Sequence, residues 1–237
     1  MNQIESVYKI LIKAYGPQGW WPLTRRGKSR HYVGLPKNDK DIFEIMCGAV
    51  LTQNTAWTNV EKALKNLYDA GMLDFSKLAR AKKEKVGELI RPAGYYNQKA
   101  ERLILLACVV QNEGLKKISG RKDLREYLLS LKGVGPETAD SIMLYAFGKL
   151  SFVIDAYTKR IFSRLGLCAV DVDYHELQKK FHEFLDTVGI KAGSKVEIFQ
   201  EYHALIVEHA KRHCKTKPLC KGCVLEKNCK FAKKPYY

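Results

Sequence analysis

A turn between two expected helices reads Leu131-Lys132-Gly133-Val134-Gly135-Pro136-Glu137-Thr138-Ala139-Asp140. Its two glycines flank one apolar residue, which lets the backbone turn tightly and approach another surface closely. Pro136 suits the first position of the second helix, where no N–H is needed, and the N–H groups that follow can bind a phosphate oxygen. The pattern suits a sequence-independent grip on a DNA backbone by residues 132–135, although a plain helix corner with glycine caps would look the same.

Outward from this turn, apolar residues recur at helical spacing along nearly the whole chain, which predicts an all-α fold. Ser194 suits the N-cap of a late helix. Only the triplet Phe152-Val153-Ile154 has the composition of an extended segment. Residues 23–40 are polar, basic and aperiodic, and we expect them to form a long surface loop.

The charge balance favours an anionic partner. The 237 residues contain 41 Lys plus Arg against 25 Asp plus Glu, a formal net charge of +16. Such an excess is most often matched by nucleic acid, although a solvated lysine-rich surface is an equally open explanation from charge alone. The N-terminus lacks a signal-peptide pattern and no apolar run approaches the roughly 20 residues of a membrane span. We therefore expect a soluble, cytoplasmic protein without a membrane partner.

The C-terminal region contains a cluster of thiols with the spacing C-x5-C-x2-C-x5-C: Cys214, Cys220, Cys223 and Cys229. Disulfides are not expected, because nothing else in the sequence indicates an oxidising compartment. A metal site remains, and zinc modules usually pair their ligands as two short knuckles, whereas only one C-x2-C is present here. The spacing thus favours a 4Fe–4S cluster over zinc. His209 and His213 are alternative ligands, or simply part of a basic helix end.

Three features in the same order resemble the endonuclease III superfamily of DNA glycosylases: the Gly-Val-Gly hairpin, the segment Val153–Arg160, and the four cysteines. The resemblance implies two helical domains with a DNA cleft between them. Residues 37–149 would form a six-helix barrel ending in the helix–hairpin–helix, and residues 1–36 with 150–237 a helical iron–sulfur domain. The implied partner is double-stranded DNA with a damaged base, bound by a monomer in a prokaryotic cytoplasm, at the nucleoid. Many family members have six residues, not five, between the first two cysteines.

By the same resemblance, Asp155 is the catalytic carboxylate that stabilises positive charge on the deoxyribose. Its position also suits a simple helix N-cap, and both roles can hold together. Glu137 stands where bifunctional members have a lysine that attacks the sugar. Because glutamate cannot form an imine, we expect a monofunctional enzyme with weak or absent AP-lyase activity.

The base-pocket residues follow from one branch of that family, the 3-methyladenine DNA glycosylase III group. The motifs Trp20-Trp21-Pro22, Phe43-Glu44, residues 48–55 and Gly94–Ala100 resemble it, which implies a base pocket of Trp20, Trp21 and Phe43. Gln53 stands where the superfamily carries its gap-filling glutamine, and we expect Lys215 and Lys217 in the cysteine loop to reach DNA phosphates. Unlike the bacterial form, this chain has the cysteine cluster and an insertion between Trp21 and Phe43.

The sequence thus predicts a base-excision N-glycosylase, with alkylated purines such as 3-methyladenine favoured. Three alternatives stay open. The protein could be a uracil or oxidised-base glycosylase with some lyase activity, a non-catalytic DNA-binding relative, or a zinc-stapled nucleic-acid adaptor.

Overall fold

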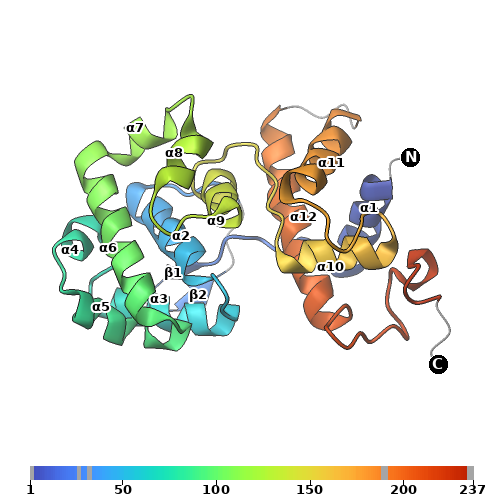
Figure 1. Ribbon diagram of the computed structural model, residues 1–237, viewed down its shortest axis with the longest axis horizontal. Coiled ribbons are helices and arrows are strands. Elements are labelled where there is room, and N and C mark those ends of the chain that lie inside the picture. The colour runs from blue at the N-terminus through green and yellow to red at the C-terminus, as the bar shows by residue number, and fades with distance from the viewer. Residues whose placement is uncertain (1–2, 26–27, 31–33, 188–191, 234–237) are drawn as a thin grey trace. The chain divides into compact units, whose positions relative to one another are not determined.

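The computed structural model describes residues 3–25, 28–30, 34–187 and 192–233, and it is all-α as predicted (Figure 1). The chain divides into two compact units. We call Trp21–Lys149 the central unit, and Met1–Trp20 with Leu150–Tyr237 the terminal unit. The expected division placed residues 21–36 with the termini, whereas the structure places them in the central unit.

The central unit holds ten helical segments and one pair of short strands among its described residues. In chain order these are β1 (Leu23–Arg25), β2 (Lys28–Arg30), α2 (Asp39–Leu51), α3 (Trp57–Asp69), α4 (Phe75–Ala79), α5 (Lys83–Leu89), η1 (Arg91–Ala93), α6 (Tyr96–Glu113), α7 (Leu115–Ser119), α8 (Leu124–Ser130), α9 (Pro136–Ser141) and η2 (Ile142–Ala146). Helix α2 is apolar on nearly every side and is buried from Phe43 to Leu51, as expected for a helix at the centre of a unit.

The strand pair corrects the expectation of a surface loop at residues 23–40. β1 and β2 are antiparallel, with Leu23 opposite Arg30. Leu23 is only 1% exposed, because β1 lies against α2 and α3. The buried Leu23 is enough to anchor the short strand, and the mostly polar composition of the stretch concealed it.

The terminal unit contains α1 (Gln3–Tyr15), α10 (Ala156–Leu165), α11 (Tyr174–Thr187), α12 (Ala192–Arg212) and η3 (Glu226–Asn228). Its core is aromatic: Phe152 stacks on Phe181 at 3.8 Å between ring centroids, and Phe162 meets Phe181 edge-on at 4.9 Å. The Tyr202 hydroxyl donates to the carbonyl of Ile4 at 2.7 Å and ties α12 to α1. Such ring pairs each add about 0.5–1.5 kcal/mol beyond simple burial.

One local expectation needs correction. Helix α12 begins at Ala192, so Ser194 lies inside the helix rather than at its N-cap. The triplet Phe152-Val153-Ile154 is non-helical and forms a buried link into α10. No helix in the described ranges is both long and apolar enough to cross a membrane.

A buried carboxyl group secures β1. The backbone N–H of Thr24 donates to Oε1 of Glu44, which is only 4% exposed. Burial raises the pKa of Glu44 from 4.5 to about 7, against the opposing effects of the Thr24 hydrogen bonds and the Arg25 charge. A folded-state pKa above the unfolded value means that the folded protein binds the proton more tightly.

We therefore predict that the protonated Glu44 carboxyl group stabilises the folded state fully below pH 4.5, and that this stabilisation is lost as the pH rises through about 7. The loss should be up to about 3 kcal/mol in the free energy of unfolding. Glu44→Gln should remove this dependence, because a neutral amide can still accept from Thr24. Urea unfolding at pH 5 and pH 8 measures it, with exposed Glu88→Gln as the matched control. The prediction would be contradicted if Glu44→Gln lost as much free energy of unfolding between pH 5 and pH 8 as the wild-type protein does.

Candidate functional site

The hairpin turn joins α8 to α9, and a buried ion pair holds the two helices together. Arg125 donates from Nε and Nη2 to the two carboxylate oxygens of Asp140 at 2.8 and 3.0 Å. The Asp140 side chain is fully buried. Removing one partner of such a buried pair would leave an uncompensated charge, which typically costs about 3–5 kcal/mol. The pair therefore fixes the angle at which the turn is presented.

The two glycines of the turn do different things. Gly133 has φ +82°, a conformation that favours glycine, and a Cβ there would lie 2.3 Å from Nε of Arg102. Gly135 has φ −95° and ψ 178°, which any residue adopts, and a Cβ there would meet nothing within 4 Å. Gly133 is thus required by the fold, whereas Gly135 leaves open space at the start of α9.

Gln53 lies against the hairpin. Its Nε2 donates to the Gly133 carbonyl at 2.8 Å and to the Thr138 hydroxyl at 2.9 Å, and its Oε1 accepts from Arg102. A hollow in the surface brings these groups together, lined by Gln53, Asn54, Gly133, Val134, Gly135, Pro136, Glu137 and Thr138. The predicted gap-filling residue and the predicted phosphate-binding turn therefore share one surface of the central unit.

Two charged residues of the turn differ in their surroundings. Lys132 is exposed but forms an ion pair with Glu101, which also pairs with Lys83 at 3.3 Å. Hydrogen bonds from Lys132, and then from Lys83, lower the pKa of Glu101. Glu137 is exposed in the first turn of α9, where a negative charge is favourable.

The loop after Gln53 and the loop before α6 contain two residues whose role the sequence did not reveal. Asn54 and Tyr95 have φ of 51° and 46°, and they are the non-glycine residues with positive φ in the described part of the chain. Such conformations cost of order 1–3 kcal/mol each and gather at functional sites. Tyr95 is also 69% exposed. The Thr55 hydroxyl donates to the Ala93 carbonyl, which joins the two loops.

Asp155 is the N-cap of α10 in the terminal unit, and only 9% of it is exposed. Its Oδ1 accepts from both the N–H and the hydroxyl of Thr158 at 2.7 Å, and Oδ2 lies 3.5 Å from Nε2 of His203. Burial acts to raise the pKa of Asp155, but the contacts with His203 and Thr158 outweigh it and hold the pKa below its usual value. The carboxylate is therefore anchored, oriented and ionised at neutral pH. His203 had no signal in the sequence, because it reaches Asp155 from α12.

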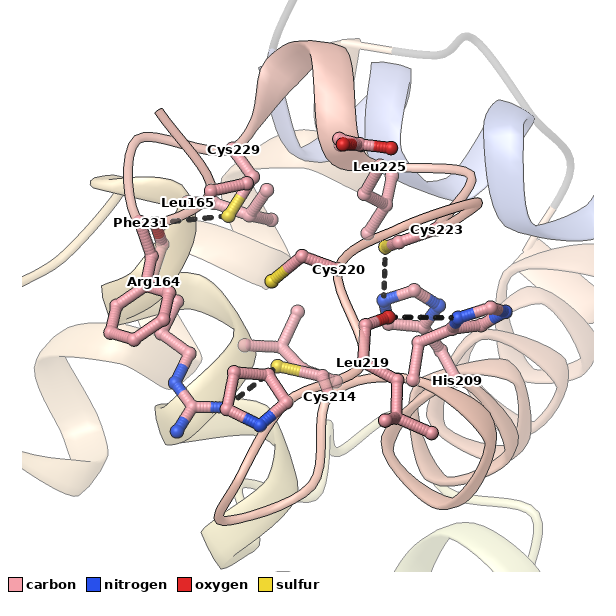
Figure 2. A pocket seen from close by; sticks show the side chains of 15 residues that line it. Arg164, Leu165, His209, Cys214, Leu219, Cys220, Cys223, Leu225, Cys229 and Phe231 are labelled. Carbon is pink, nitrogen blue, oxygen red and sulfur yellow. Dashed lines mark hydrogen bonds between the residues drawn. The ribbon is translucent and has the colours of Figure 1, made fainter. Parts of the chain in front are cut away.

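The four clustered cysteines line one apolar cavity, and none forms a disulfide (Figure 2). Cationic and polar groups approach the sulfur atoms: Arg164 Nη1 lies 3.3 Å from Sγ of Cys214, and His209 Nε2 lies 3.7 Å from Sγ of Cys223. Burial lowers the pKa of His209 to about 4, with a smaller effect of His213, so the ring is neutral.

Four thiolates are a donor set that both a zinc ion and a 4Fe–4S cluster accept. Within the described ranges, no three His, Cys, Asp or Glu side chains are placed to hold one metal ion together. The four thiols line one apolar cavity, and a cluster would bind its thiolates around a larger centre than a single ion.

Helix α10 carries the loop that contains these cysteines. Arg160 donates to the Cys214 carbonyl at 2.9 Å, and Arg164 donates to the carbonyls of Lys215 and Thr216 at 2.6 and 2.9 Å. The side chains of Lys215 and Lys217 remain exposed, as phosphate contacts would require.

The predicted pocket aromatics do not form one open site within either unit. Phe43 has no exposed surface and meets Phe75 edge-on at 5.8 Å, so in this structure it is a core side chain. Trp21 is 5% exposed and packs on Trp57 and Tyr145, at 5.2 and 5.3 Å. Trp20 is half-buried in the terminal unit, and Nζ of Lys211 lies 5.9 Å from its ring.

Comparison with known proteins identifies the family. Residues 47–187 match the model of the HhH-GPD superfamily base excision DNA repair protein. The chain belongs to the HhH-GPD superfamily. A provisionally named DNA repair glycosylase of Methanocaldococcus jannaschii is 43% identical over 234 residues, 96% of each chain. Endonuclease III of Thermotoga maritima is 32% identical, covering 83% of this chain and 87% of the relative.

Solved structures agree with this membership. The Helicobacter pylori 3-methyladenine DNA glycosylase bound to 1,N6-ethenoadenine aligns with TM-score 0.70 and 30% identity, covering 90% of this HhH-GPD chain and 98% of that one. A trapped endonuclease III–DNA covalent intermediate aligns with TM-score 0.74 and 23% identity over 98% and 96% of the two chains, which supports the fold. The resemblance found in the sequence is confirmed, and this HhH-GPD protein is a DNA repair glycosylase.

The different roles of the two hairpin glycines lead to a paired prediction. Gly133→Ala should destabilise the protein by about 1–3 kcal/mol, because the added methyl group meets Arg102 and the backbone is strained. Gly135→Ala should leave the melting temperature unchanged and weaken binding to an undamaged duplex about tenfold, because its methyl group fills the space where a phosphate would approach. Thermal unfolding and fluorescence anisotropy measure the two effects. Unchanged DNA affinity in Gly135→Ala would exclude this backbone from the DNA contact.

Proposed function

We propose that this protein is a monofunctional glycosylase that hydrolyses the N-glycosidic bond of a flipped, damaged base in double-stranded DNA. The observation that carries the proposal is the Asp155 carboxylate, which is buried, ionised and fixed through one oxygen by Thr158. Bond cleavage develops positive charge on the deoxyribose, and a fixed negative group that needs no reorganisation stabilises that charge. The same carboxylate can orient water and accept its proton.

The absence of a lyase step rests on Glu137. A carboxylate at this position of the hairpin cannot form the imine that a lysine would form. Water is then the nucleophile, and the products are the free base and an intact abasic strand.

Alkylated purines are the favoured substrates. The similarity to the H. pylori 3-methyladenine DNA glycosylase supports this class, since that protein binds 1,N6-ethenoadenine. Trp20 and Trp21 are the candidate stacking residues, because an electron-poor methylated purine is attracted to an indole face. Phosphates would be held by the hairpin backbone, Lys132, Lys215 and Lys217, with Gln53 filling the gap left by the base and the protein acting as a monomer.

The test uses a conservative change at Asp155. Asn is as good an N-cap as Asp, so Asp155→Asn should keep the start of α10 intact while removing the charge. We expect the rate of base release to fall about a thousandfold with DNA affinity preserved. The substrates are duplexes containing 3-methyladenine, 7-methylguanine, hypoxanthine, uracil or an oxidised base, under single-turnover conditions. Undiminished release by Asp155→Asn would reject the mechanism, and release of uracil alone would reject the substrate class.

A second candidate is a glycosylase with lyase activity, favoured by the 32% identity to an endonuclease III. Borohydride reduction during turnover separates the two, because it traps an imine between protein and DNA. We expect no covalent product from the wild-type protein. Efficient trapping would mean that a lysine such as Lys132 or Lys159 supplies the amine.

We further propose that Cys214, Cys220, Cys223 and Cys229 hold a 4Fe–4S cluster with a structural role. When bound, the cluster would cross-link the C-terminal loop. Protein purified without oxygen should be brown, with about four irons and four sulfides per chain, and Cys220→Ala should lose them. The melting temperature should fall in parallel. Colourless protein with one zinc per chain would contradict the proposal.

A further inference from the structure

Lys99, in the first turn of α6, is a buried charge that the proposed chemistry does not use. It is only 1% exposed. Its Nζ donates to the carbonyls of Leu51 and Ala93 at 2.8 and 2.9 Å and to the hydroxyl of Thr55 at 2.9 Å. These three bonds use all three protons of the ammonium group. All three acceptors are neutral oxygens rather than carboxylates.

Core packing does not explain this arrangement. A lysine is almost never fully buried, because removing its charge from water is costly. Burial, with a smaller contribution from the nearby Arg102, lowers the pKa of Lys99 to about 8, yet the group remains charged at neutral pH. An apolar side chain of similar length would fill the same space without that cost. What only the ammonium supplies is three directed hydrogen bonds from one point.

Two of the three acceptors flank the loop that lines the candidate DNA-binding hollow with Gln53 and Asn54, and the third precedes the Tyr95 loop. Leu51 is the last residue of α2, Thr55 closes the loop that carries Gln53, and Ala93 ends η1 just before the Tyr95 loop. The Thr55 hydroxyl in turn donates to Ala93. One ammonium therefore connects the bases of two loops, and each loop contains a residue with positive φ, Asn54 in one and Tyr95 in the other.

We propose that Lys99 is a positioning residue whose ammonium holds the Gln53 loop and the Tyr95 loop together in the geometry that opens a DNA base pair. The inference rests on the proposed function, because Gln53 matters only if a base leaves the stack. A strained backbone conformation persists only where surrounding contacts hold it in place. The three hydrogen bonds of Lys99 are such contacts for the loops that contain Asn54 and Tyr95. Gln53 is then pre-placed against the hairpin instead of being ordered on binding.

The first test needs no DNA and compares hydrogen exchange in wild-type protein and Lys99→Met. We expect amides of residues 52–55 and 94–97 to exchange at least tenfold faster in the variant, while those of α9 are unchanged. Leu103→Ala is the matched control, because Leu103 is fully buried one turn further along α6. It should lower stability without selective exchange in the two loops. Equal exchange of the loops in wild type and Lys99→Met would overturn the proposal.

The second test measures affinity for a duplex with a tetrahydrofuran abasic-site analogue relative to the same duplex undamaged. We expect Lys99→Met and Gln53→Ala each to reduce the wild-type preference about tenfold, and the double variant to be no worse than either single one. Such non-additivity is the signature of residues acting through one another, and additive losses would overturn the proposal. Binding of undamaged DNA by Lys99→Met should be unchanged.

If Lys99→Met does not fold, Thr55→Val carries the same test. It removes one acceptor of the ammonium while keeping the shape of the side chain. We expect faster exchange in both loops and a weaker preference for the abasic analogue, and wild-type behaviour in both measurements would overturn the proposal. Wild-type protein without any preference for the abasic duplex would instead count against the proposed glycosylase function, and the exchange test would still decide the role of Lys99.

Discussion

A closed set of contacts around Gly133 is the constraint on which the central unit's candidate DNA-binding surface depends. The positive φ of Gly133 lets Arg102 lie directly against the turn. Arg102 donates to Gln53, and Gln53 donates to the carbonyl of Gly133. Each group therefore holds the next, and none can move alone without leaving a polar group unsatisfied. The hairpin and the gap-filling side chain form one rigid element for this reason.

Buried charged groups also fix the orientation of neighbouring segments elsewhere in the central unit. The Arg125–Asp140 pair sets the angle of the hairpin helices, and Lys99 connects two loops through three neutral oxygens. These groups are expensive to bury, and apolar replacements would often be as stable. What charged groups provide is direction, because a hydrogen bond fixes an orientation that apolar packing leaves free. These charged groups lie near the candidate DNA-binding surface, where the hairpin and Gln53 must keep their relative positions.

In the terminal unit, α10 has a different function at each end. Its N-cap is Asp155, whose carboxylate is kept ionised by His203 and by the capping bonds with Thr158. Its second half holds the cysteine loop through Arg160 and Arg164, and Figure 2 shows Arg164 beside Cys214. A helix is stiff over ten residues, so the loop and the carboxylate share one support. An ordered cysteine loop therefore helps to hold Asp155 in place through α10, although only the carboxylate takes part in the proposed chemistry.

The sequence by itself determined the features that depend on local pattern. Helical spacing gave the all-α fold, and the Gly-Val-Gly-Pro hairpin, Asp155 and the four cysteines were recognisable because short-range geometry fixes their spacing. Tertiary structure decided what distant segments do to one another. His203 reaches Asp155 from α12, Lys99 joins loops that are 38 residues apart at Thr55 and Ala93, and Leu23 anchors a strand in a polar stretch. Phe43 proved to be core, since the burial of one residue depends on which helices pack around it. Contacts between residues far apart in the chain leave no periodic signal, so only the folded structure reveals them.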